Sequence, residues 1–267
     1  MKTVWITALA DEPARVAAVA ATLRRYGLQA QAHRWLDEPD KGVARAALDA
    51  IAAAEAHAWL VLVSPQTLAQ PGVRYGLSLL RASLADGSRP PLPVFCLWPD
   101  GGAADATQLP PLLQDAHCAV DGQAAWPAKV VAATARRPNA GEPLPTADYR
   151  LTAWGDERIG QWVEIGPRHT TLDGFVFGVC PGDGAPAAIE FQAVGPRGGL
   201  PERTTLEYAQ QGLTVTAGER TFECWAVRNT IDTDHSYFAR LKGSAQALLC
   251  MPFTERDDAE ASVITLR

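Results

Sequence analysis

The sequence predicts an α/β domain with a parallel sheet, followed by a β-rich domain. Three observations lead to this prediction. Short apolar runs alternate with helical stripes over the first 135 of the 267 residues. Residues 136–147 (RRPNAGEPLPTA) contain three prolines and no hydrophobic periodicity, which is typical of a semi-stiff linker. Beyond them, apolar residues recur with a period of two between turn sequences. We therefore assign 1–135 to the α/β domain, 136–147 to the linker and 148–267 to the β-rich domain.

In the first domain, strands and helices are predicted in alternation. Thr3–Ala8 is a short apolar, β-branched run, which suits a strand buried on both faces. Asp11-Glu12-Pro13 opens a helix, because acidic side chains favour the first turn and the missing N–H of proline costs nothing there. Further strands are predicted over residues 30–35, 58–63, 92–98 and 116–120, and further helices over 43–51, 73–84 and 125–135. Such alternation implies a parallel sheet covered on both faces.

The second domain alternates with the period of a strand. Ile189, Phe191 and Ala193 alternate with Glu190 and Gln192. Further short strands are predicted at Phe175–Val179, Leu213–Val215, Phe222–Ala226, Ala247–Met251 and Val263-Ile264. Short strands separated by frequent turns predict a sandwich, a barrel or a prism.

Composition limits the location and the partners. The net charge is −6, and no Lys/Arg run exceeds two residues, so we predict no nucleic-acid partner. No segment approaches 18 uninterrupted apolar residues, which predicts no membrane span. Asp11 and Glu12 interrupt the apolar start too early for a signal peptide. The five cysteines are scattered, as expected of reduced thiols in a cytosol, so we predict a cytoplasmic protein.

Two groups of side chains are candidates for binding. Asp232-Thr233-Asp234-His235 contains metal-ligating types, but such a string is more often a polar loop, and we predict neither a metal nor a cofactor. Trp154, Trp162 and Trp225 either pack in the core of the β-rich domain or line a site there for a protein or carbohydrate ligand.

Three blocks of residues resemble a bacterial Toll/interleukin-1 receptor (TIR) domain. Val4-Trp5-Ile6-Thr7 followed by Asp11-Glu12 is similar to the opening strand and loop of that family. The run Trp35–Gly42 (WLDEPDKG) matches its acidic loop after the second strand, and Trp59–Pro65 with Val73-Arg74-Tyr75 matches its third strand and following helix. The resemblance covers residues 1–135 and implies a flavodoxin-like fold and a role in signal transduction.

Gly76 departs from the family pattern. Members that cleave NAD use a glutamate at this position, which is thought to stabilise the charge that develops as nicotinamide leaves. Glycine offers neither an acceptor nor a charge, and loss of one such group typically costs roughly 10²–10⁴-fold in rate. We therefore expect no NADase activity. The alternative is an NAD or nucleotide glycosidase that uses another acid, Glu38 or Glu12, with NAD as its substrate.

The loop Trp35–Gly42 is the predicted interaction surface. It carries three carboxylates within four residues (Asp37, Glu38 and Asp40), beside Pro39, and in the family the matching loop mediates assembly between domains. A simple solvated loop, in which Asp40 caps the next helix, is the other interpretation. The sequence thus leaves three hypotheses: a TIR-like signalling or scaffold protein that assembles with itself or with other TIR domains, the glycosidase, and a ligand-binding β module beside a decorative α/β domain.

Overall fold

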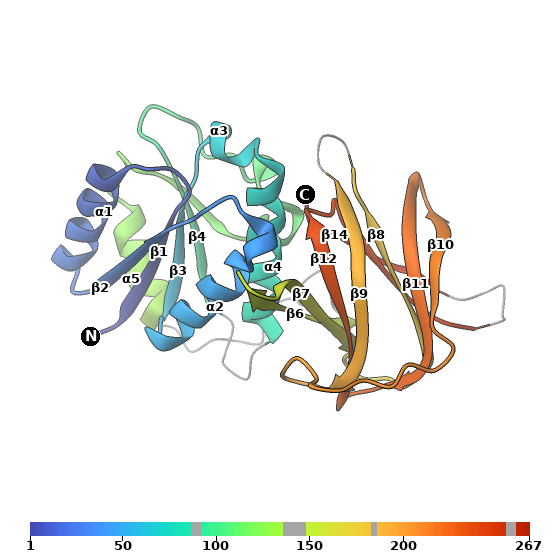
Figure 1. The fold of residues 1–267 in the computed structure, drawn as a ribbon. Coiled ribbons are helices and arrows are strands. Elements are labelled where there is room, and N and C mark those ends of the chain that lie inside the picture. Colours follow the sequence, from blue (N-terminus) through green and yellow to red (C-terminus); the bar gives the residue numbers. More distant parts are fainter. Residues whose placement is uncertain (87–91, 136–147, 183–185, 255–259) are drawn as a thin grey trace.

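The computed structural model describes residues 1–86, 92–135, 148–182, 186–254 and 260–267. Its first half contains a parallel sheet of five strands in the order β2-β1-β3-β4-β5. Their bounds are β1 Thr3–Ala8, β2 Gln29–Arg34, β3 Ala58–Leu62, β4 Val94–Trp98 and β5 His117–Val120. Strands β1, β3 and β4 are buried throughout because helices cover both faces of the sheet (Figure 1). The predicted α/β architecture with a parallel sheet is confirmed.

Two helices cover each face of this sheet. One face packs against α1 (Pro13–Arg25) and α5 (Trp126–Ala135), and the other against α2 (Val43–Ala53) and α4 (Pro71–Asp86). The remaining helical segments are short: α3 Pro65–Leu68, η1 Pro39–Lys41, η2 Ala106–Gln108 and η3 Pro111–Leu113. Within the described residues, no helix is long and apolar enough to cross a membrane.

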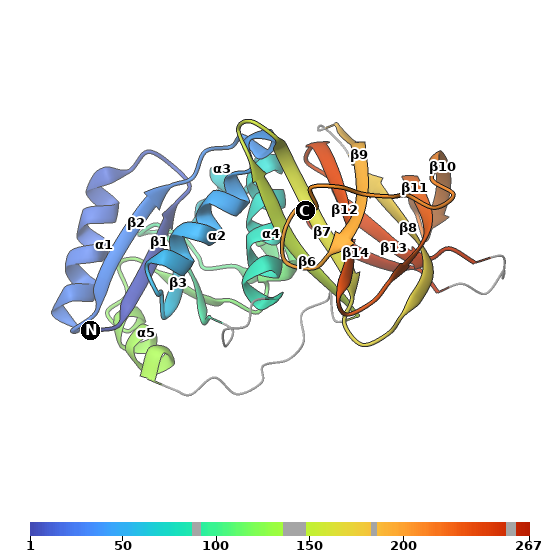
Figure 2. The ribbon, with the colours of Figure 1, turned by 60° about the horizontal axis from the view of Figure 1, so that its bottom comes forward.

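The second half contains two antiparallel sheets packed face to face, so of the three predicted architectures it is a sandwich (Figures 1 and 2). The four-stranded sheet has the order β6-β7-β12-β9, and the five-stranded sheet has the order β10-β11-β8-β13-β14. Their bounds are β6 Tyr149–Asp156, β7 Gly160–Pro167, β8 Leu172–Cys180, β9 Ala187–Pro196, β10 Gln210–Ala217, β11 Arg220–Ile231, β12 His235–Gly243, β13 Ala247–Pro252 and β14 Ser262–Thr265. Aromatic rings join the sheets, with Tyr237 between Phe175 and Phe177 at 5.3 and 5.5 Å.

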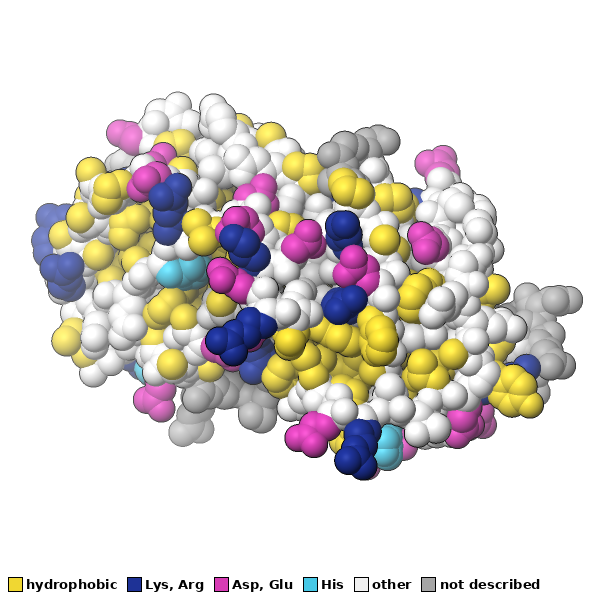
Figure 3. Space-filling model, viewed as in Figure 1, with side chains coloured by type: hydrophobic (Ala, Val, Ile, Leu, Met, Phe, Trp, Pro, Cys, Tyr) yellow, Lys and Arg dark blue, Asp and Glu magenta, His cyan; other side chains and the backbone are white. Residues whose placement is uncertain are grey.

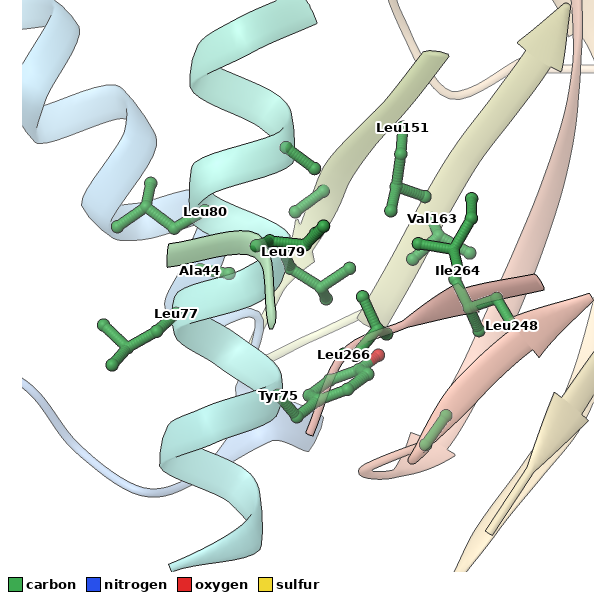
Figure 4. Close-up of a cluster of buried hydrophobic side chains, with 14 of the residues drawn as sticks. Ala44, Tyr75, Leu77, Leu79, Leu80, Leu151, Val163, Leu248, Ile264 and Leu266 are labelled. Carbon is green, nitrogen blue, oxygen red and sulfur yellow. The ribbon is translucent and has the colours of Figure 1, made fainter. Parts of the chain in front are cut away.

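Helix α4 connects the two halves because it is buried on both sides. In Figure 4, Leu77 and Leu80 point away from the β half, whereas Tyr75 and Leu79 face it, near Leu266. All four belong to one hydrophobic cluster that also contains Phe175 and other core residues of the sandwich. The two halves therefore share this cluster, and each half also has a smaller hydrophobic cluster of its own. The assigned linker, 136–147, lies outside the described residues.

Polar contacts fix the orientation of α4 on the β half. Ser78 Oγ donates to the carbonyl of Leu266 at 2.6 Å, and Ser83 Oγ accepts from the backbone N–H of Ala153 at 2.9 Å. At the C-terminal end of the helix, the nearly buried carboxylate of Asp86 accepts from Thr152 Oγ1 at 2.9 Å and from Arg168 at 3.2 Å. Replacing one partner by an apolar residue would leave the other buried and unpaired, which costs about 1–3 kcal/mol for each group.

This interface predicts that the two halves stay together after the chain is cut. A protease site inserted within residues 136–147 should yield two fragments that co-elute in size-exclusion chromatography at low ionic strength and in 1 M salt. Leu79→Asp in the cut protein should release them, since it places a charge in the shared core. Elution of two separate, folded fragments from the protein with Leu79 intact would contradict the shared core.

Candidate functional site

The loop after β2 is anchored to helix α4 by the ring of Trp35. The backbone N–H of Trp35 donates to the carbonyl of Ala8 at 2.8 Å, which prolongs the β1–β2 pairing by one residue. Its side chain is buried and lies on α4 at Gly76. A Cβ atom at position 76 would overlap Trp35 Cζ2, and the three nearest heavy atoms all belong to this ring. Position 76 is therefore filled by an indole from the loop.

The same loop contacts a second glycine of α4, one helical turn before Gly76. The side chain of Asp37 lies on Gly72, where an added Cβ would overlap Oδ1. Gly72 and Gly76 are spaced i and i+4, so they share one face of the helix. Partial burial there raises the pKa of Asp37 above its ordinary value. Asp37 is therefore the carboxylate that rests on this face of the helix.

The end of the loop contacts the β half. Asp40 Oδ1 accepts from the backbone N–H of Gly243 at 2.7 Å and from Gln161 Nε2 at 3.3 Å. Asp40 does not cap α2: the N-cap residue is Gly42, in the left-handed conformation with φ of 68°, and no side chain caps it. A Cβ at Gly42 would lie 2.7 Å from the carbonyl oxygen of Gly155, so only glycine allows this approach.

Between these two anchors, a short segment faces solvent. Leu36 is 50% exposed, which is unusual for a large apolar residue in a loop tied down at both ends. Glu38 is exposed and pairs with Lys41 at 2.8 Å, and Pro39 begins the 3₁₀ turn. Of the six predicted contact residues, Glu38 faces solvent beside Leu36, whereas Trp35, Asp37, Asp40 and Gly42 make contacts within the chain.

Neither predicted substitute acid contacts Gly76. Glu12 pairs with Arg15 at 3.0 Å, and Arg15 is held by Asp121 and by the carbonyl of Leu97. Glu38 pairs with Lys41, as described above. Each acid thus has a basic partner, and the ring of Trp35 occupies position 76.

A small hollow lies where α2, α4 and the β6–β7 hairpin meet. Its cavity volume is only about 10 Å³, and Gly76, Tyr75, Trp154 and Trp162 are among its lining residues. Ligand pockets for drug-sized molecules typically exceed about 300 Å³, and a dinucleotide needs more than that. Trp154 closes one side, with the Arg45 guanidinium 3.7 Å from its ring centroid. The hollow therefore does not accommodate NAD beside Gly76.

The three candidate tryptophans have different environments. Trp154 lies at the junction of the two halves, where its Nε1 donates to the buried carboxylate of Glu164 at 2.7 Å. Trp225 packs against the shared core cluster. Trp162 is partly exposed on the outer side of the four-stranded sheet and meets Phe191 edge-to-face at 5.8 Å. All three are partly buried, and Trp162 is the one that lies beside the exposed Phe191.

The candidate metal string forms a turn before β12. Asp232 Oδ1 accepts from the backbone N–H groups of Asp234 and His235 at 2.8 and 2.7 Å, which lowers the pKa of Asp232. Across the described part of the chain, no three His, Cys, Asp or Glu side chains are grouped to hold a metal ion. The five cysteines are free thiols, four of them buried.

A partly buried histidine lies next to the anchor of the loop. Trp5 Nε1 donates to His33 Nδ1 at 2.6 Å, and the His33 ring is tilted against that of Trp35, with the ring centroids 6.3 Å apart. Burial lowers the pKa of His33 to about 4. The acceptor role of Nδ1 requires a neutral ring, so the geometry and the pKa agree.

No known family model matches this chain, and no curated protein is similar to it.

Sequence analysis did not identify Gly72 and Arg45 as parts of this site. The spacing of Gly72 and Gly76 could have predicted the contact with the loop, since two glycines at i and i+4 in a helix leave a groove for a close neighbour. Arg45 carried no signal, because its aromatic partner Trp154 is 109 positions away in the chain and belongs to the other half.

The packing of Trp35 on Gly76 predicts a coupling between these positions. Gly76→Ala should lower the free energy of unfolding by about 1–3 kcal/mol, because the added methyl overlaps the indole. In a Trp35→Ala background, the same change should raise it by up to about 1 kcal/mol, because alanine favours a helix. Urea unfolding of the four proteins measures this double-mutant cycle. An equal effect in both backgrounds would show that the ring does not press on Gly76.

His33 predicts a loss of stability in mild acid. Its pKa is 6.5 when unfolded and about 4 in the folded protein, so the unfolded chain binds the proton first as the pH falls. The free energy of unfolding should therefore decrease between about pH 6.5 and pH 4, by about 2–3 kcal/mol at most. His33→Gln keeps an acceptor for Trp5 and should flatten this part of the curve. An unchanged slope in the variant would assign the loss to other groups, such as Asp37.

Proposed function

We propose that this protein is a TIR-like signalling scaffold without NADase activity, whose α/β half assembles with other copies or with other TIR domains. The observation that carries this proposal is the packing of Trp35 on Gly76. It leaves no space for a glutamate, and it fixes the loop so that Leu36 and Glu38 are displayed to solvent.

Anchoring at both ends suits the outward segment for assembly. A loop held in its bound conformation loses less entropy on association. An apolar side chain beside a charged one is a usual combination at interfaces, since Leu36 would be desolvated while Glu38 sets the orientation.

In this proposal the β half recognises a protein or carbohydrate ligand through the outer side of its four-stranded sheet. Figure 3 shows hydrophobic side chains gathered on this face. Phe191 and Ile159 are 49% and 45% exposed, and Phe191 lies against Trp162. Aromatic rings on an open sheet offer rigid contact area at a low cost in entropy, which suits either class of ligand.

The alternative remains a glycosidase that uses Glu38 or Glu12. The glycosidase and the scaffold are distinguished by an assay of nicotinamide release from NAD. The assay runs over hours at micromolar protein, alone and under crowding that forces assembly. The scaffold proposal expects no turnover above that of the buffer. Turnover that is abolished by Glu38→Ala or Glu12→Ala would establish the enzyme instead.

Self-association of the α/β half should depend on Leu36 and Glu38. The double variant Leu36→Asp/Glu38→Lys should weaken concentration-dependent assembly, measured by light scattering, and should change the melting temperature little because both side chains are exposed. We choose these positions over Asp37, which packs on Gly72. Arg24→Glu on α1 is the matched control for an exposed change of charge. Equal assembly in the double variant and the wild type would place the contact elsewhere.

A further inference from the structure

Strand β10 is an open edge at the end of the molecule farthest from α1 (Figures 1 and 2). Among the described strands it pairs with β11 alone. Its sequence, QQGLTVTA, has no charged residue and no proline. Natural proteins usually protect an open edge with lysine, proline or a covering segment, because its free N–H and C=O groups pair readily with another strand.

The register shows which backbone groups point outward. Ala217 pairs with Arg220 across the two-residue turn Gly218-Glu219, so these two exchange both hydrogen bonds, as in a tight hairpin. Bonded and non-bonded pairs alternate along an antiparallel ladder. Leu213, Val215 and Ala217 therefore bond to β11, whereas the N–H and C=O groups of Thr214 and Thr216 face the free edge.

We propose that two copies of this protein pair through β10, antiparallel, about a two-fold axis at Val215. This register satisfies every outward group, because Thr214 of one copy bonds Thr216 of the other, and the reverse. Val215 then faces its own equivalent, and Leu213 faces Ala217 of the second copy. Thr–Thr and β-branched pairs are favourable across antiparallel strands.

Charge and exposure favour a second copy as the partner. The chain carries a net charge of −6, which opposes most self-contacts, but this strand is neutral. The paired residues 213–217 carry no charge, so no like charges oppose each other across the two strands. Leu213 and Val215 are half-buried at the rim of an apolar cluster that contains Phe222. Pairing would cover this rim.

The left-handed Gly212 limits the interface. With φ of 69° it interrupts the register between Gln210 and Leu213. Pairing is thereby confined to residues 213–217 of each copy. Two-fold pairing uses both edges completely, so it produces a closed dimer. This inference does not depend on the proposed function, since it uses neither the loop after β2 nor the outer side of the four-stranded sheet.

A cysteine at the axis tests the register directly. In the proposed dimer, the two Val215 Cα atoms are a non-bonded pair about 4.5 Å apart, within the range of a disulfide. The two Leu213 Cα atoms are about 14 Å apart along the strands. Val215→Cys should therefore form a disulfide-linked dimer under mild oxidation, seen on a non-reducing gel, whereas Leu213→Cys and the wild type with its native cysteines should not. Absence of the Val215→Cys dimer, or equal cross-linking of both variants, would overturn the proposal.

A second experiment uses no cysteine. Thr214→Pro removes an outward N–H and leaves the bonds to β11 in place, so it should raise the dimer dissociation constant about tenfold or more in sedimentation velocity. Thr214→Val keeps that N–H and should dimerise like the wild type. A wild-type protein that sediments as a monomer throughout, or dimerisation unaffected by proline, would refute β10 pairing. Leu36→Asp/Glu38→Lys should leave this dimer intact, which separates it from assembly through the loop.

Discussion

The burial of helix α4 on two opposite sides is the constraint on which the rest of the structure depends. A helix that covers a sheet normally keeps one polar side for solvent. Here Leu77 and Leu80 pack in the α/β core, and Tyr75 and Leu79 pack at the junction with the sandwich. The polar residues that interrupt the second side, Ser78 and Ser83, are satisfied by the β half. Neither half could therefore lose the other without exposing apolar surface and unpaired polar groups.

The same helix determines the loop after β2. Small residues at 72 and 76 allow Trp35 and Asp37 to approach the helix axis closely, and the sandwich then holds Asp40 from the other end. A glutamate at position 76 would displace the indole and with it the loop. The glycine at position 76 and the packing that fixes the loop are thus one structural feature, which supports the scaffold proposal over the enzymatic one.

Most of the fold could be predicted from the sequence because its signals are local. Strand β1 lies at Thr3–Ala8 as predicted, since an apolar β-branched run before an acidic helix start has few other interpretations. Strand β12 was not predicted, because both of its faces are largely buried and its apolar residues therefore do not alternate with polar ones. The two-sided burial of α4 was partly visible. Val73, Leu77, Leu80 and Leu84 gave one stripe, but Leu79 and Tyr75 were extra apolar residues whose partner lies beyond residue 148.

The site was less predictable for the same reason. The contacts of Asp40 join residues more than 120 positions apart, and no local pattern reports them. Fewer residues of the loop are available for assembly than its sequence suggested, because six of its eight residues contact the rest of the chain or belong to the turn that ends the loop. The positions of the loop and of β10 determine how copies of the chain could assemble. The loop lies at the junction of the two halves, where Asp40 contacts Gly243, whereas β10 is at the end of the sandwich farthest from α1, so two-fold pairing at β10 would leave the loop uncovered (Figure 2). Copies with two different self-complementary surfaces would form a closed tetramer where the two-fold axes intersect, and an open array where they do not. Either assembly would bring several copies of the proposed ligand-binding face together, which increases avidity without any new contact.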